Sequence, residues 1–279
     1  MTYFFIGGCP RSGTTLVQSI LCSDPATNPL IGEVGYLYHL VEAYHSAKLD
    51  FESQGRYFFN DFIDLKQFST SLVQSFLNQL QKHYTDATDL VLKHPVLSRF
   101  FPDVYELLEE NVKFIVVIRD PRDTISSLIQ VGERMKQQGN KRHLTSLFTQ
   151  RNMAEYLKFY QSIYAPAWNF KSDDFQSKTC YIKYEYLVCD PNSALQDLRN
   201  FTGLNLTPSD VEKVWKRNLV EHSQLQDAAQ PFYSDLYGQP ISQTRIQKYQ
   251  QVLNADEIDF IEHQGLEIFK LFGYPLSFD

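Results

Sequence analysis

The chain has 279 residues, of which 43% are hydrophobic and 21% charged, and this balance excludes a disordered chain, a collagen and a coiled coil. Lysine and arginine number 26 against 33 aspartates and glutamates, so the net charge is −7. This charge disfavours a general nucleic-acid binder, which needs a basic footprint. Any anionic ligand must therefore be held by a local cluster of donors.

Short β-rich runs alternate with longer segments of helical periodicity. This alternation predicts an α/β fold in which a central parallel sheet, buried on both faces, is flanked by helices. The predicted strands are Tyr3 to Gly7, Leu90 to Lys93, Phe114 to Ile118 and Thr179 to Lys183. The predicted helices between them are Thr14 to Cys22, Glu33 to Ala47, Phe68 to Tyr84, Val104 to Glu110, Thr124 to Gln138 and Met153 to Phe170.

The C-terminal third is predicted to be helical, and the irregular segment Asn218 to Pro240 interrupts it. This stretch is either a lid or a long surface loop, and we favour a functional loop because long irregular stretches are uncommon inside compact domains. Repeats and linker-like runs are absent from the sequence, which predicts one domain over residues 1–279. The predicted C-terminal helices are Asn192 to Thr202, Ser209 to Arg217, Arg245 to Leu253 and Glu257 to Phe272.

The cysteines and the N-terminus bear on the compartment. Cys9, Cys22, Cys180 and Cys189 form no C-x-x-C pair, so neither a structural zinc site nor a disulfide framework is expected. The start of the chain has no signal-peptide pattern, and no apolar run approaches the roughly 20 residues of a membrane span. We expect a complete cytoplasmic protein without a membrane partner.

A glycine-containing loop joins the first predicted strand to the first predicted helix. Gly8 and Gly13 stand where a P-loop has its two glycines, and Thr15 stands at its Ser/Thr position. The backbone N–H groups of such a turn, with the helix N-terminus behind them, form an anion cradle. Thr14 replaces the lysine with which nucleoside triphosphatases reach the β- and γ-phosphates, and Arg11 supplies a cation earlier in the loop. The loop predicts a 5′-phosphoryl group that carries one small further anion.

The run Pro10-Arg11-Ser12-Gly13-Thr14-Thr15-Leu16 resembles the 5′-phosphosulfate loop of sulfotransferases that use 3′-phosphoadenosine 5′-phosphosulfate (PAPS). The branch it resembles contains tyrosylprotein sulfotransferases and many bacterial enzymes. The resemblance implies a P-loop-containing nucleotide-binding fold and PAPS as the sulfuryl donor, and it requires no metal. The residues that it assigns to the 5′-phosphosulfate are Arg11, Ser12, Gly13, Thr14 and Thr15.

Arg119 and Ser127 resemble the 3′-phosphate clamp of the same family. Arg119 follows the buried strand that ends at Ile118, and Ser127 comes eight residues later, in a predicted helix. An arginine can bind phosphate with two parallel hydrogen bonds, and a serine can donate its hydroxyl from the first turns of a helix. Two other interpretations stay open: Asp120 as a magnesium ligand, and a surface pair between Arg119 and Asp123.

Sulfuryl transfer needs a base for the acceptor and a cation near the leaving oxygen. By resemblance to the tyrosylprotein-type enzymes, Glu33 is the base and Lys93 stabilises charge on the transferring group. A first-turn acid that complements a helix dipole is the alternative for Glu33. His94 is the rival base, as in cytosolic small-molecule sulfotransferases. We favour Glu33, because Lys93 and His94 are adjacent and neighbouring residues at a strand end tend to point in opposite directions.

Two weaker resemblances complete the site. Tyr184 resembles a tyrosine that contacts the nucleotide, with a packed aromatic residue as the alternative. The segment Ile241 to Lys248 resembles the one that closes over PAPS, and its place after the irregular stretch agrees with a lid. The resemblance places Thr244, or in its stead Ser242, near the sulfuryl group, and adds charge from Arg245 and Lys248.

The chain is therefore interpreted as a PAPS-dependent sulfotransferase that modifies an O–H or N–H of a small-molecule acceptor and releases 3′,5′-diphosphoadenosine (PAP). The alternatives are a magnesium- and ATP-dependent P-loop kinase, which the missing lysine at Thr14 disfavours, and a non-catalytic nucleotide-binding scaffold, which Glu33 and Lys93 disfavour.

The acceptor is predicted from the chain as a whole. Its resemblance to bacterial, including cyanobacterial, tailoring enzymes implies a natural product of secondary metabolism, such as a cationic guanidinium alkaloid of the saxitoxin type. Protein tyrosine and carbohydrate are the alternative acceptors, and the length of the chain leaves room for a homodimer.

Overall fold

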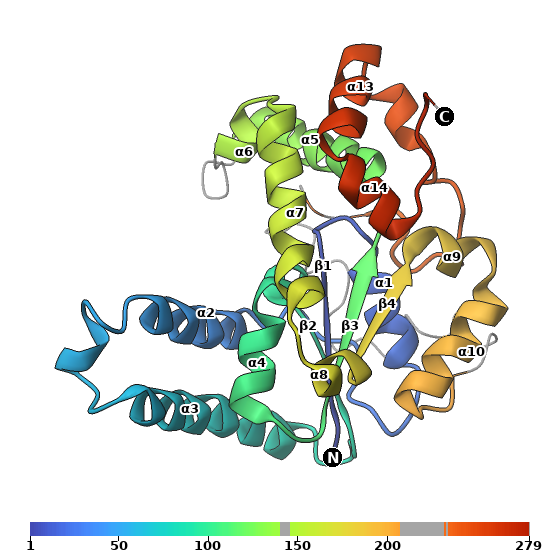
Figure 1. The fold of residues 1–279 in the computed structure, drawn as a ribbon. Helices are drawn as coiled ribbons and strands as arrows, with labels where there is room; N and C mark the ends of the chain where they lie inside the picture. The colour runs from blue at the N-terminus through green and yellow to red at the C-terminus, as the bar shows by residue number, and fades with distance from the viewer. Residues whose placement is uncertain (140–145, 207–231, 233, 279) are drawn as a thin grey trace.

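The computed structural model describes residues 1–139, 146–206, 232 and 234–278. Its centre is a parallel four-stranded sheet in the order β2-β1-β3-β4, which confirms the predicted α/β architecture (Figure 1). All four strands therefore end at one edge of the sheet, where parallel sheets bind ligands. The strands are β1 (Tyr3–Gly8), β2 (Leu90–Lys93), β3 (Val112–Ile118) and β4 (Thr179–Lys183), within two residues of the predicted bounds.

Apolar side chains alternate between the two faces of the sheet, as the two-residue period of a strand requires. On β1, Phe5 packs into the core on one face, while Phe4 and Ile6 pack into the core on the other. The first face is covered by α2 (Gly35–Leu49), α3 (Phe62–His83), α4 (Phe101–Leu108) and α7 (Met153–Asn169). The second face is covered by α1 (Thr14–Leu21), α9 (Tyr184–Cys189) and α10 (Pro191–Thr202).

Local capping explains where several helices begin. Asp120 caps α5 (Pro121–Gln137) by accepting a hydrogen bond from the Arg122 N–H at 2.8 Å. Asn254 and Glu257 form a capping box at the start of α13 (Ala255–Gln264). The helix predicted over Glu257 to Phe272 is wrong as one element, because it is divided at Gly265 into α13 and α14 (Leu266–Phe272).

The helix predicted over Arg245 to Leu253 is also wrong, since only a short 3₁₀ helix, η5 (Lys248–Gln251), forms there. The Asp123 carboxylate accepts hydrogen bonds from the backbone N–H groups of Gln247, at 2.8 Å, and Tyr249, at 2.9 Å. Gln247 also has a left-handed φ of 57°. A tertiary contact thus takes the place of the helical hydrogen bonds.

Short elements that the sequence did not predict are α9, η1 (Gly55–Tyr57), η2 (Pro95–Phe100), α6 (Ser146–Thr149) and α8 (Asp173–Ser177). The predicted helix Ser209 to Arg217, and most of the irregular segment Asn218 to Pro240, lie outside the described residues. Within the described part of the chain, every helix is too short or too polar to span a bilayer.

Candidate active site

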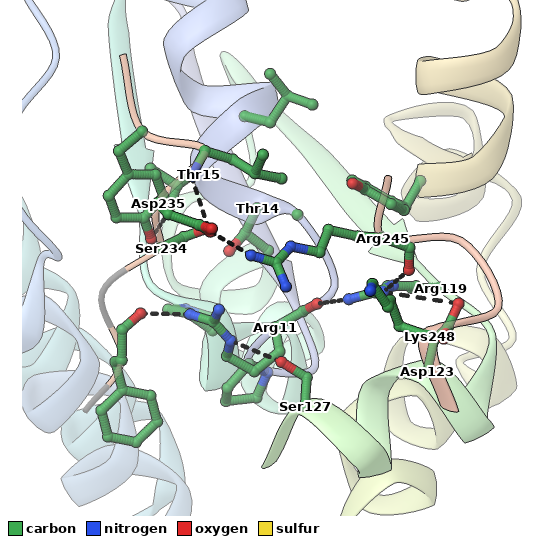
Figure 2. A pocket seen from close by; sticks show the side chains of 18 of the residues that line it. Arg11, Thr14, Thr15, Arg119, Asp123, Ser127, Ser234, Asp235, Arg245 and Lys248 are labelled. Atoms are coloured by element: carbon green, nitrogen blue, oxygen red, sulfur yellow. Dashed lines mark hydrogen bonds and ion pairs between the residues drawn. The ribbon is translucent and has the colours of Figure 1, made fainter. Parts of the chain in front are cut away.

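A cavity of about 680 Å³ is bordered by the loop after β1, by one face of α5 and by the C-terminal segment around residues 234–248 (Figure 2). Most of the predicted site residues line it, although they come from six separate parts of the chain. They are Arg11, Gly13, Thr14, Thr15, Glu33, His94, Arg119, Ser127, Tyr184, Arg245 and Lys248. Ser12, Lys93 and Thr244 do not line it.

The loop after β1 depends on its two glycines. Gly8 has a φ of 148°, and a Cβ atom there would lie 2.3 Å from the Val117 carbonyl oxygen. Gly13 has a φ of 99°, and its Cβ would lie 2.6 Å from the Tyr184 ring. Ser12 is fully buried and its hydroxyl lies close to Gly8, so this side chain belongs to the underside of the loop and not to the cavity.

Arg11 reaches from this loop to α5 and to the C-terminal segment. Its Nε donates to Ser127 Oγ at 3.1 Å, and its Nη1 donates to the carbonyl oxygen of Phe232 (Figure 2). Arg11, which is expected to bind the 5′-phosphosulfate, therefore contacts Ser127, whose hydroxyl is expected to bind the 3′-phosphate. The two parts of the predicted donor site face one cavity.

Four guanidinium groups gather around this cavity. Burial lowers the pKa of Arg11, and the nearby positive charges lower it further, while the Tyr237 phenol acts in the opposite direction. Cations held this close destabilise one another, and a bound anion would relieve the repulsion. The three other guanidinium groups belong to Arg119, Arg134 and Arg245.

Arg119 connects the two ends of the site. Its Nη1 donates to the Arg11 carbonyl oxygen at 3.0 Å, and its Nη2 donates to the Arg245 carbonyl oxygen at 2.5 Å. The guanidinium carbon lies 4.9 Å from the centre of the Tyr184 ring. Asp123 pairs with Arg119 at 3.6 Å, but the two side chains are only 1% and 7% exposed, so this is not a surface pair. The Arg119 Nε is buried, and no described residue accepts its hydrogen.

Asp120 has a structural role, because its carboxylate belongs to a buried ion-pair network. Its carboxylate pairs with Arg122 at 2.6 Å, and Arg122 also pairs with Glu262 at 2.5 Å, with all three side chains buried. Asp120 does not line the cavity. This geometry disfavours its interpretation as a magnesium ligand.

Glu33, Lys93 and His94 meet at the side of the cavity next to β2. Lys93 Nζ donates to Glu33 Oε1 at 2.7 Å, and His94 Nε2 lies 3.9 Å from Glu33 Oε2. The expectation that Lys93 and His94 point in opposite directions is therefore wrong, because β2 ends at Lys93 and the carboxylate lies within reach of both side chains. Val34, not Glu33, is the cap residue of α2, so Glu33 precedes that helix.

The pKa values of the two candidate bases both lie below their ordinary values. Burial raises the pKa of Glu33, but the charge and hydrogen bond of Lys93, together with His94, outweigh it and lower the pKa. Burial lowers the pKa of His94 from 6.5, and Glu33 only partly opposes this. At neutral pH the pair is therefore a carboxylate beside a neutral imidazole.

The C-terminal segment lies against the loop after β1. Arg245 pairs with Asp235, and the Tyr237 hydroxyl lies 3.3 Å from Thr15 Oγ1 (Figure 2). Ser242 lines the cavity, whereas Thr244 is exposed and hydrogen-bonds to Ser242 at 3.0 Å. The alternative residue, Ser242, is therefore better placed than Thr244.

Several residues of the cavity were missed by sequence reasoning. Gln130 and Arg134 follow Ser127 by three and seven positions on α5, and helical spacing from Ser127 could have found them. Asp235 and Tyr237 lie in a segment without periodicity, and no sequence signal distinguishes them.

A family model described as "Sulfotransferase family" matches residues 4–208. The chain belongs to the sulfotransferase family. The resemblance to the sulfotransferase family is thereby confirmed.

Three similar proteins illustrate the range of this sulfotransferase family. A putative protein-tyrosine sulfotransferase of Caenorhabditis briggsae is 26% identical over 200 residues, which are 72% of this chain and 65% of that protein. The sulfotransferase domain from the curacin biosynthetic pathway has a TM-score of 0.61 at 18% identity, and 99% of each chain is covered. A mouse sulfotransferase solved in complex with PAP has a TM-score of 0.52 at 14% identity, with 96% of this chain and 85% of the mouse chain covered.

Proposed function

We propose that this sulfotransferase moves the sulfuryl group of PAPS to an O–H or N–H group of a small-molecule acceptor and releases PAP. The observation that carries the proposal is the gathering of guanidinium groups at the loop after β1, where Arg119 keeps a buried N–H that no described residue accepts. PAPS bears a phosphosulfate and a separate phosphate, and both groups match donors of this kind. The mouse relative solved with PAP supports the same donor.

The donor would be held from two directions. Arg11, Thr14 and Thr15 line the loop side of the cavity and would bind the 5′-phosphosulfate, where the first turn of α1 also favours an anion. Arg119 and Ser127 would bind the 3′-phosphate on the α5 side, with Arg245, Lys248 and the missed Arg134 nearby. Tyr184, packed against Gly13 and Arg119, would support the nucleotide.

The acceptor would be activated at Glu33. A carboxylate that stays ionised at neutral pH can take the acceptor proton, and Glu33 lines the cavity with half of its side chain exposed. Lys93 holds Glu33 in place and brings a positive charge to this side of the cavity. His94, which is neutral and also lines the cavity, is the competing base. When bound, PAPS supplies the electrophilic sulfuryl group.

A small-molecule acceptor, with a cationic guanidinium alkaloid among the candidates, is part of the same proposal. The fold similarity to a domain of the curacin biosynthetic pathway supports a natural product, whereas the name of the C. briggsae relative points to protein tyrosine. The single sheet, whose strands span residues 3–183, supports one domain over residues 1–279.

Calorimetric titration with PAP, and separately with ADP plus magnesium, tests the donor. We expect micromolar binding of PAP that is lost in Arg119→Ala and weakened about tenfold in Ser127→Ala, because one hydrogen bond to a charged group contributes roughly 1.5 kcal/mol. Since Arg119 also holds two backbone carbonyls, its variant must first show an unchanged melting temperature. Preference for ADP with magnesium would overturn the proposal. A screen of alkaloid, peptide and carbohydrate acceptors with PAPS, read by mass, then separates the acceptor classes.

A further inference from the structure

Tyr237 lies over the loop after β1, although nothing in the phosphate-binding motif predicts it. Its hydroxyl is 3.3 Å from Thr15 Oγ1, and the half-buried Tyr237 lines the same cavity as Thr15 and Arg11. The phenol also acts on the pKa of Arg11 from nearby. The hydroxyl therefore lies beside the first turn of α1, in the cavity that Arg11 also lines.

The hydrogen bond between the Tyr237 hydroxyl and Thr15 Oγ1 is weak. Both groups are neutral, and 3.3 Å is long for a bond between two hydroxyl groups. A phosphate or sulfate oxygen is a stronger acceptor, because hydrogen bonds to charged groups are shorter and roughly twice as strong. Thr15 belongs to the first turn of α1, where the helix dipole adds to the attraction. An anion at the loop would thus draw both hydroxyl donors towards itself.

Other contacts fix the segment that carries Tyr237. Asp235 pairs with Arg245, and Arg11 donates to the carbonyl oxygen of Phe232. The Leu236 N–H donates to Ser234 Oγ at 3.3 Å and stabilises the local turn. These contacts do not involve the Tyr237 hydroxyl, which lies beside Thr15 Oγ1.

We propose that the Tyr237 hydroxyl, together with Thr15 Oγ1, binds the 5′-phosphosulfate end of PAPS. The C-terminal segment would then contact the 5′ end of PAPS directly. The inference rests on the proposed use of PAPS. It assigns the contact to the 5′ end because the hydroxyl contacts Thr15, in the first turn of α1, directly after the loop that carries Arg11.

A cycle of two ligands tests this assignment. PAP and adenosine 3′-monophosphate differ only in the 5′-phosphate, so the ratio of their dissociation constants measures what that phosphate contributes. We expect Tyr237→Phe to weaken PAP about tenfold and to change the 3′-monophosphate less than twofold. Thr15→Val should act on the same ligand, and the double variant should weaken PAP by less than the product of the two single effects.

Tyr186→Phe is the matched control, because the Tyr186 hydroxyl bonds to Asp197 at 3.0 Å on the surface and outside the cavity. Equal weakening of both ligands by Tyr237→Phe would mean that the phenol only supports the fold of the segment, and it would overturn the inference. An unchanged affinity for PAP would overturn it as well. Failure of the wild-type protein to bind PAP would instead refute the proposed donor, so the two failures are distinguishable.

Discussion

Two regions near the end of β3 hold arginine side chains, and they differ in how completely carboxylates neutralise them. Arg122 is enclosed by the carboxylates of Asp120 and Glu262 and lies over the rings of Tyr249 and Phe269. Among the described residues that line the cavity around Arg11, four guanidinium groups face three carboxylates, and no described residue accepts the hydrogen of the Arg119 Nε. The comparison teaches that burial of a cation does not reveal its role, whereas the presence or absence of matching carboxylates does.

Replacement of Arg122, the arginine that carboxylates neutralise, should have the largest effect, and the effect should be on stability. Arg122→Met leaves two buried carboxylates without the cation that neutralises them, so we expect a loss of about 3–5 kcal/mol in the free energy of unfolding. Urea denaturation followed by circular dichroism measures this loss. Arg56→Met, at an exposed position, is the control and should change stability by less than about 0.5 kcal/mol. A loss below about 1 kcal/mol at Arg122 would contradict the structural role.

Glu33 should show the reverse pattern, with a large effect on turnover and a small one on stability. Glu33→Gln removes the proposed base, and we expect kcat to fall about 100- to 1,000-fold while the affinity for PAP stays within twofold. The control is Glu42→Gln, a half-buried carboxylate of α2 that accepts a hydrogen bond from the Tyr38 hydroxyl at 2.7 Å and does not line the cavity. Should Glu33→Gln retain full activity while His94→Gln is inactive, His94 would be the base.

The pH profile tests the pairing of Glu33 with Lys93. Lys93 lowers the pKa of Glu33, so the proposed base stays ionised at pH values below the ordinary pKa of a glutamate. We therefore expect the acidic limb of the kcat/KM profile at a pH below that ordinary pKa. In Lys93→Met the pKa of Glu33 rises and this limb moves to higher pH. The same limb in both proteins would mean that another group controls it.

Arg134 should give the smallest effect, because it lies at the far end of the α5 face. We expect Arg134→Gln to weaken PAP about three- to tenfold, and the loss should shrink as salt screens the interaction. Lys136→Gln, an exposed cation on the same helix, should leave the affinity unchanged. A loss at Lys136 as large as that at Arg134 would show that only the general charge of α5 matters.

The sequence predicted the sheet, the loop after β1 and most of the cavity, because these features depend on local patterns. Buried strands are continuous apolar runs. Gly8 and Gly13 have positive φ values, and a Cβ atom at either position would clash with its surroundings, so the loop requires glycine there. The failures have a tertiary origin. The Asp123 carboxylate accepts hydrogen bonds from the backbone N–H groups of Gln247 and Tyr249. The helical periodicity of residues 245–253 could not predict this contact, because Asp123 lies far away in the sequence. Tyr237 and Asp235 enter the site only because their segment returns to the loop.

That return has a consequence for how the protein is made. The contact between Arg11 and Phe232 joins residues that are 221 positions apart. At a translation rate of roughly 5–20 residues per second, the loop waits roughly 10–45 s on the ribosome for its last partner. A nascent chain therefore completes the cavity at this loop only near the end of synthesis. Retention on immobilised PAP would accordingly separate finished chains from truncated ones.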